Sequence, residues 1–282
     1  MAATAVLLPV LALFGRVRGG WMALLGLLTG ALIFPMAACW VWGGGWLASM
    51  GQTLARGHGA VDHAGSGVVY LPGGMIAWGA LTALGREAPR EGPAEMPPAH
   101  FPLLANLGVL LVVVGWLGWS LSGPLHADGA RLDAGRIAVN GLLATAGATL
   151  TALFYCWLAL GHGDPLMVAR GTAGGLVAIS AGAPFLPQWA ALVVGGVAGL
   201  LVPLGVYLVD RILRLADATA AVATAALPGL WGLLAVALFA DGRWGQGWNG
   251  IGAEVYRTII GQGVSLCILS PDVLRFNKLF RQ

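Results

Sequence analysis

The chain has 282 residues, of which 58% are hydrophobic and only 10% charged, and its mean hydropathy is +0.81. This composition is typical of a polytopic membrane protein and excludes an ordinary soluble domain. The formal net charge is +3, and because no basic residues form a continuous patch, we expect no binding to nucleic acid.

Apolar runs predict about nine membrane helices, several of them interrupted by Gly or Pro, as is common where helices pack closely. The runs are Thr4–Phe14, Gly20–Ala38, Gly65–Leu84, Leu103–Leu121, Ile137–Leu160, Gly171–Ala183, Trp189–Val209, Val222–Ala240 and Ile251–Leu269. Between the second and third runs, Trp40–Gly65 is expected to be a long polar excursion. The sequence therefore predicts an all-α helix bundle in a single integral membrane domain, residues 1–282.

The basic residues between the runs predict the orientation in the membrane. Successive connections lie on opposite sides of the membrane. Those on one side hold the larger set of basic residues: Arg16, Arg18, Arg86, Arg90, Arg170, Arg211, Arg214, Arg275, Lys278 and Arg281. Those on the other side hold Arg56, Arg131, Arg136 and Arg243. Positive residues are retained on the cytoplasmic side of membranes. We therefore expect an inner or plasma membrane location with a cytoplasmic C-terminus.

Small residues recur every three or four positions from Gly171 to Gly232, a spacing that lets helix backbones approach closely. This stretch resembles the eighth to tenth helices of the ammonium transporter (Amt/Rh) family, which read "AGLVAITAGA…WAALVIG…AG" and "DDALDVFAVHGVGGIWG". Residues 41–46, 61–70 and 115–119 similarly resemble the family's "VWGGGW", "LDFAGGTVVHI" and "GWFGF". The resemblance implies that 1–84 is a remnant of a first half, 103–240 a second five-helix half, and 251–282 the last helix with a cytoplasmic tail.

The resemblance also implies a set of site residues. Trp42 matches a vestibule Trp that offers ammonium a cation–π face, and Asp62 matches an Asp that caps the fifth helix. The remaining positions depart from the family's pattern, since residues of other types stand at the two pore histidines, a gate Phe and a vestibule Ser. Tyr70 and Ala225 stand at the two histidine positions, Trp119 at the gate Phe and Gly123 at the vestibule Ser. A second gate Phe falls at about Met1.

These departures predict a degenerate, non-conducting protein, because Tyr has a reference pKa of about 10 and Ala offers no hydrogen bond. The main hypothesis is a structural or accessory subunit of a larger membrane complex, embedded in the lipid bilayer. Another membrane protein is expected near Met1–Phe14 and the open pore face. The alternatives are a divergent ammonium or ammonia channel, completed by a partner or as a homo-oligomer, and an ammonium sensor acting through Trp42 and Asp62.

Other chemistry finds little support. No Ser/His/Asp, phosphate-loop or CxxC constellation is present, so we predict neither an enzyme nor a cofactor. His58 and His63 lie close to Asp62, but no third ligand stands at metal spacing, and both histidines are expected to be solvated in a loop rather than bound to a metal.

Overall fold

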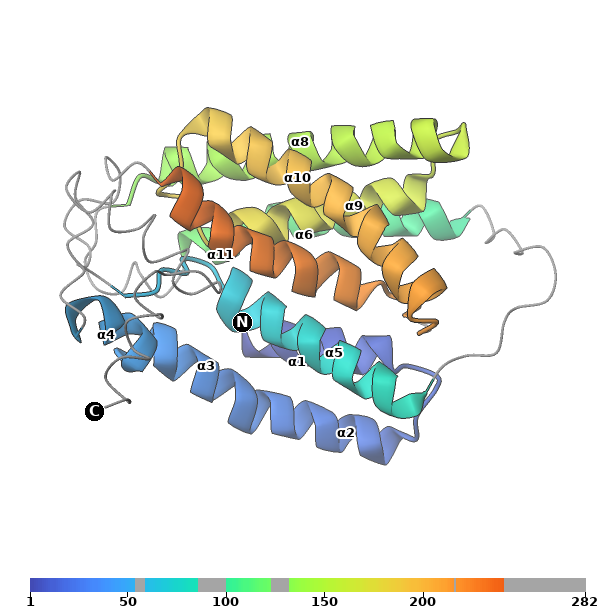
Figure 1. The fold of residues 1–282 in the computed structure, drawn as a ribbon, viewed down its shortest axis with the longest axis horizontal. Coiled ribbons are helices and arrows are strands. Elements are labelled where there is room, and N and C mark those ends of the chain that lie inside the picture. The colour runs from blue at the N-terminus through green and yellow to red at the C-terminus, as the bar shows by residue number, and fades with distance from the viewer. Residues whose placement is uncertain (54–58, 86–99, 123–131, 216, 241–282) are drawn as a thin grey trace, which may run out of the picture.

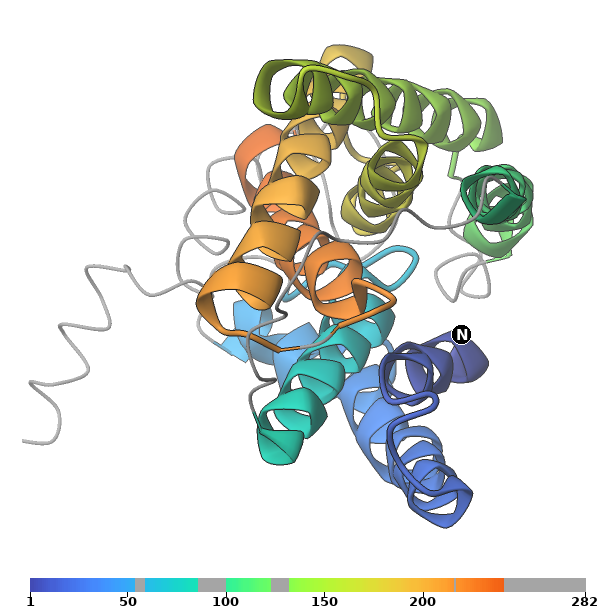
Figure 2. The same ribbon diagram turned by 90° about the vertical axis from the view of Figure 1, so that its right-hand side faces the viewer.

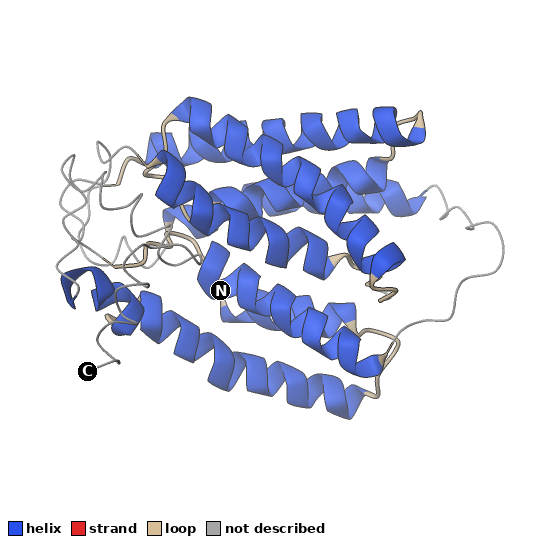
Figure 3. Cartoon of the chain, viewed as in Figure 1, coloured by secondary structure: helices blue, strands red, loops and turns tan. Residues whose placement is uncertain are grey.

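The computed structural model describes residues 1–53, 59–85, 100–122, 132–215 and 217–240, and every regular element among them is helical (Figure 3). In chain order these are α1 Ala2–Ala12, α2 Gly19–Leu28, η1 Thr29–Ile33, α3 Phe34–Val41, α4 Trp46–Thr53, η2 Ser66–Tyr70, α5 Leu71–Leu84, α6 His100–Leu121, α8 Ala134–Leu160, α9 Pro165–Ile179, α10 Gln188–Tyr207, η3 Leu208–Ile212, η4 Val222–Ala226 and α11 Leu227–Phe239, where η marks a π-helical segment. The predicted all-α bundle is confirmed. The ninth run, Ile251–Leu269, lies outside the described residues.

Two predicted boundaries were wrong. Helical structure continues from Gly19 to Val41, and α4 occupies part of the stretch expected to be a polar excursion. A turn at Gly44, whose φ is +71°, separates α3 from α4. Likewise α9 begins at Pro165 rather than Gly171, because the Asp164 side chain accepts a hydrogen bond from the Leu166 backbone N–H and so caps the helix.

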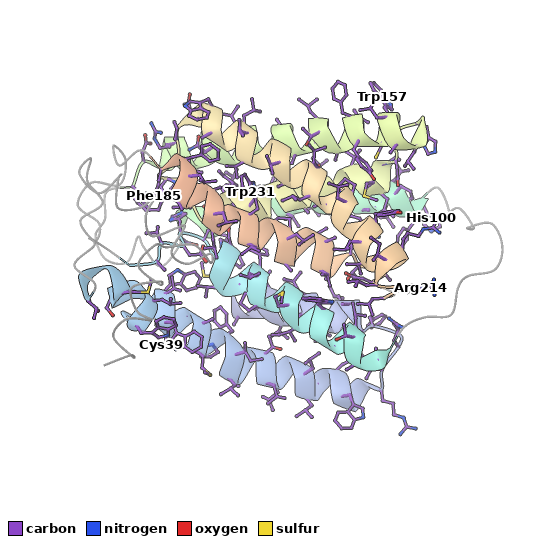
Figure 4. All side chains as sticks on the ribbon, viewed as in Figure 1. Cys39, His100, Trp157, Phe185, Arg214 and Trp231 are labelled. Atoms are coloured by element: carbon purple, nitrogen blue, oxygen red, sulfur yellow. The ribbon has the colours of Figure 1, made fainter. Side chains whose placement is uncertain are left out.

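Six helical stretches among the described residues are long and apolar enough to cross a membrane: Gly19–Met50, Ser66–Leu84, His100–Leu121, Ala134–Leu160, Gln188–Ile212 and Val222–Phe239. They lie side by side with their ends gathered at two opposite sides of the bundle (Figure 1). Phe185 marks one end, whereas His100 and Arg214 lie at the other (Figure 4). The chain is therefore a multi-pass integral membrane protein.

The helices α8, α9 and α10 pack against one another through small residues, as the spacing predicts. A Cβ atom on Gly171 or Gly175 of α9 would lie 2.5 Å from the Cβ of Ala152 or Ala148 in α8. On the other side, Gly199 of α10 meets the backbone of Ala148. Figure 2 shows this group on one side of the bundle, α1–α3 on the opposite side, and α5 with α11 between them.

The two central spans, η2–α5 and η4–α11, begin in the same way and run in opposite directions (Figure 1). Each is preceded by an aspartate, Asp62 or Asp217, and three residues later by a left-handed residue, Gly65 with φ +96° or Ala220 with φ +54°. The residues of each pair are 155 positions apart (217 − 62 and 220 − 65). The bundle thus contains an inverted repeat that the sequence analysis did not detect.

Contacts between the two spans obey the same spacing. A Cβ on Gly74 would lie 2.5 Å from the backbone N of Ala226, and one on Gly229 would lie 3.1 Å from the backbone N of Leu71. Gly229 is 155 residues after Gly74, and Ala226 is 155 after Leu71, so the contact is reciprocal. The division of the chain into 1–84, 103–240 and 251–282 remains a prediction, and its last part lies outside the described residues.

Candidate functional site

The candidate site is built around residues 61–65, here named the capping loop, which precede η2 and are buried. The Asp62 carboxylate accepts hydrogen bonds from the backbone N–H groups of Gly65 at 2.9 Å, Gly67 at 2.7 Å and Val68 at 2.8 Å. These are donors at a helix start that have no partner within the helix. Burial raises the pKa of the Asp62 carboxyl above its ordinary value, and the same N–H donors act in the opposite direction.

Two tryptophans donate to the backbone of the capping loop from different helices. Trp42, which ends α3, donates its indole N–H to the Asp62 carbonyl oxygen at 2.6 Å. Trp119 of α6 donates to the Ala64 carbonyl oxygen at 2.8 Å. The Trp119 ring in turn stacks on Tyr70, with ring centroids 6.1 Å apart and planes inclined by 27°. The structure therefore brings together four predicted site residues that lie far apart in the sequence.

The other predicted site positions are Ala225, Gly123 and Met1, of which the structure describes Ala225 and Met1. Ala225 is buried in η4, with 1% of its surface exposed, and its side chain contributes no polar atom. Gly123 lies outside the described residues. Met1 packs into the cluster formed by Ala5, Val68 and Val69, which also holds Tyr70, Trp119 and Trp42.

The expectation of a solvated His63 was wrong, because this residue is fully buried in the capping loop. Its Nε2 lies 2.9 Å from the Ser120 carbonyl oxygen, and its ring meets the Phe185 ring edge-on at a centroid distance of 6.4 Å. A loop position suggests that a His side chain is exposed to solvent. The His63 side chain is buried because it contacts α6 and the turn that follows α9. His58 lies outside the described residues, and among those described no three metal-ligating side chains lie together.

Sequence reasoning also missed Asp217. Its carboxylate accepts hydrogen bonds from the backbone N–H groups of Ala221 at 3.0 Å and Val222 at 2.8 Å, so it holds the start of η4 as Asp62 holds η2. A signal was present, because Asp62 precedes Tyr70 by eight residues (70 − 62) and Asp217 precedes Ala225 by the same number (225 − 217). Two buried carboxylates thus hold the first turns of the two central spans.

The model of the Ammonium Transporter Family matches residues 1–270. The chain belongs to this family. Ammonium transporter Amt2 of Archaeoglobus fulgidus is 36% identical over 220 residues, which are 76% of this chain and 46% of the relative. Ammonium transporter 1 member 1 of Oryza sativa is 33% identical over 273 residues, or 90% of this chain and 53% of the relative. The chain thus spans about half the length of the curated relatives it matches.

Solved structures give the same fold. Mep2 of Saccharomyces cerevisiae superimposes with a TM-score of 0.75 at 24% identity, covering 94% of this chain and 60% of Mep2. A sensor Amt protein gives a TM-score of 0.72, also at 24% identity, covering 93% of this chain and 65% of the sensor. At this identity the likeness shows the fold alone, a partial ammonium transporter bundle.

Proposed function

We propose that this family member carries ammonium or ammonia across a membrane along a path whose lining departs from the family's pattern. The observation that carries the proposal is a connected unit in which the Trp42 N–H binds the Asp62 carbonyl and the Asp62 carboxylate holds the start of η2. A Trp ring held in this way offers ammonium a cation–π face. The similarity to named ammonium transporters supports this choice of substrate.

The positions beyond Trp42 favour passage of neutral ammonia. A bare ammonium ion is costly in an apolar environment, and neither Tyr70 nor Ala225 supplies a group that titrates near neutral pH. In this proposal ammonium leaves its proton to water at Trp42, and ammonia continues past the stacked Tyr70 and Trp119 rings. The Tyr70 hydroxyl exchanges hydrogen bonds with the passing ammonia, a role that needs no change of protonation.

Liposomes that contain the purified chain and a trapped pH-sensitive dye test the proposal. Ammonia entry after an ammonium pulse takes up internal protons, so the internal pH should rise faster than in empty liposomes. Trp42→Leu should raise the half-saturating ammonium concentration several-fold, because the cation–π face is lost. Trp46→Leu is the matched control, since Trp46 is 58% exposed in the next helix and should leave the flux unchanged. A response equal to that of empty liposomes would overturn the proposal.

The second candidate is a non-conducting structural or accessory subunit. It is favoured by the packing of Met1 and Phe34 against the same cluster as Tyr70 and Trp119, which fills the region with side chains. It is also favoured by α1, whose Leu7 is 50% and Leu11 46% exposed, a surface that another membrane protein could cover. Ammonium binding without flux, lost in Trp42→Leu, would instead support a sensor that uses Trp42 and Asp62.

Site-specific photocrosslinking in native membranes tests the second candidate. Probes at Ala3 and Leu7 face outward from α1, whereas Val6 packs against Gly26 of α2 and Gly30 of η1 and serves as the internal control. A distinct membrane protein captured at Ala3 and Leu7 but not at Val6 would support a subunit role. Capture of copies of this chain would indicate a homo-oligomer, and capture of lipid alone would contradict both forms of association.

A further inference from the structure

Residues 63–64 of the capping loop and 119–120 of α6 exchange hydrogen bonds reciprocally. The His63 side chain donates to the backbone carbonyl of Ser120, and the Trp119 side chain donates to the backbone carbonyl of Ala64. The Ser120 carbonyl belongs to the last turn of α6, where carbonyl oxygens have no partner within the helix. The two aromatic N–H groups thus join the loop to the end of the helix at adjacent residues on both sides.

The far side of the loop is also fixed. The backbone N–H of His63 donates to the Ala181 carbonyl at 3.0 Å, and that of Ala64 donates to the Ser180 carbonyl at 2.8 Å. Ser180 is joined to α6 as well, because its hydroxyl accepts a hydrogen bond from the Trp116 N–H at 2.9 Å. The loop is therefore a fixed base, and the two reciprocal bonds transfer its position to Trp119.

The two side chains that donate these bonds stand at positions where, by the resemblance, this chain departs from the family's motifs. His63 stands where "LDFAGG" has Phe, and Trp119 stands where "GWFGF" has its last Phe. Phe has no N–H, so neither bond could form with the family's residues. The third departure in this region, Tyr70, is the ring on which Trp119 stacks. Changes at three separate places in the sequence therefore meet in one arrangement.

We propose that His63 is a positioning residue that holds the Trp119 ring against Tyr70 and so limits the rate at which the substrate passes. This inference rests on the proposed transport function for its consequence, but not for its geometry. Because the Trp42 ring is held by a separate bond to Asp62, releasing the His63 bond should change the maximal rate without changing vestibule affinity. His63 thus acts through the end of α6, not by contact with the substrate.

Fluorine NMR of the protein labelled with 5-fluorotryptophan tests the geometry. The Trp119 resonance is identified by its loss in Trp119→Phe. The variant His63→Phe keeps an aromatic ring beside Phe185 but removes the donor, so the Trp119 resonance should shift and broaden as the ring gains freedom. His63→Gln, whose amide can donate to the Ser120 carbonyl, should restore it. His162→Phe is the control, because His162 is exposed and follows the C-terminal end of α8, away from the capping loop.

The liposome assay tests the consequence with the same variants. We expect His63→Phe to raise the maximal flux several-fold at an unchanged half-saturating concentration, and His63→Gln to return it to the wild-type value. A Trp119 resonance unmoved in His63→Phe overturns the positioning role, whatever the flux. A moved resonance with unchanged flux, in a wild-type protein that transports, overturns the rate-limiting role. A wild-type protein without flux contradicts the proposed function, while the resonance still decides the geometry. His63→Leu repeats both measurements if His63→Phe does not fold.

Discussion

Replacing Gly74 by alanine tests the close contact between the two central spans. The added Cβ would lie 2.5 Å from the backbone N of Ala226 and 2.8 Å from its Cβ, both well inside ordinary van der Waals contact. The neighbouring atoms belong to backbone and to a side chain without rotamers, so they cannot turn away, and α5 must move from η4 by about 1 Å. Overpacking of this kind costs about 1–3 kcal/mol.

The matched control is Gly79→Ala in the same helix, because a Cβ at Gly79 would have no atom within 4 Å. Alanine gains up to about 1 kcal/mol over glycine in a helix, so this variant should be neutral or slightly stabilised. The two variants should therefore differ by about 2 kcal/mol, or about 4–8 °C in melting temperature. Thermal unfolding in detergent, followed by the loss of the monodisperse peak in size-exclusion chromatography, measures the difference. Equal melting temperatures would refute the contact, and Gly229→Ala should behave like Gly74→Ala.

Two further predictions concern the capping loop and the orientation. Asp62→Asn replaces one carboxylate oxygen by an amide NH₂ group, which cannot accept hydrogen bonds from the Gly67 and Val68 N–H groups. This variant should therefore lower the free energy of unfolding by about 2 kcal/mol or more. Its control is Asp133→Asn at the exposed start of α8, which should cost under about 1 kcal/mol in the same melting assay. The orientation is tested in a cysteine-free background with a thiol reagent that does not cross the membrane. Arg18→Cys and His162→Cys should react only from the cytoplasm, and Ser122→Cys only from outside. The reverse pattern would contradict the proposed orientation with a cytoplasmic C-terminus.

The membrane helices were predictable because the bilayer imposes them. Every backbone polar group must be satisfied inside hydrocarbon, so a long apolar run becomes a helix whatever its local propensity. The Gly-rich stretch from Gly171 shows this, since α9 and α10 form there despite residues that are poor helix formers in water. Boundaries were less predictable, because Asp164 and the turn at Gly44 act through single hydrogen bonds and dihedral angles.

The candidate site was predictable only in part, for a physical reason. The resemblance to the family pointed to Trp42 and Asp62, but it could not reveal that two indole N–H groups converge on the capping loop from α3 and α6. The sequence also does not predict the residue with a left-handed backbone conformation that precedes η4. Ala220 takes the conformation that Gly65 takes in the other span, and alanine gives no local signal for a positive φ. Burial of His63 depends likewise on elements distant in the chain.

The departures from the family's pattern that the resemblance implies bear on whether the candidate site has lost its function. Loss of function removes the need for any particular side chain, and random replacement in an apolar region would leave buried donors without acceptors, at about 1–3 kcal/mol each. Here the opposite holds for Trp119, which stands where the quoted motif has Phe, because its indole N–H reaches the Ala64 carbonyl oxygen at 2.8 Å. Tyr70 also has its ring stacked rather than displaced. The rings that replace the family's residues in this region are thus accommodated by hydrogen bonding or by stacking, as the proposed transport along an altered lining requires.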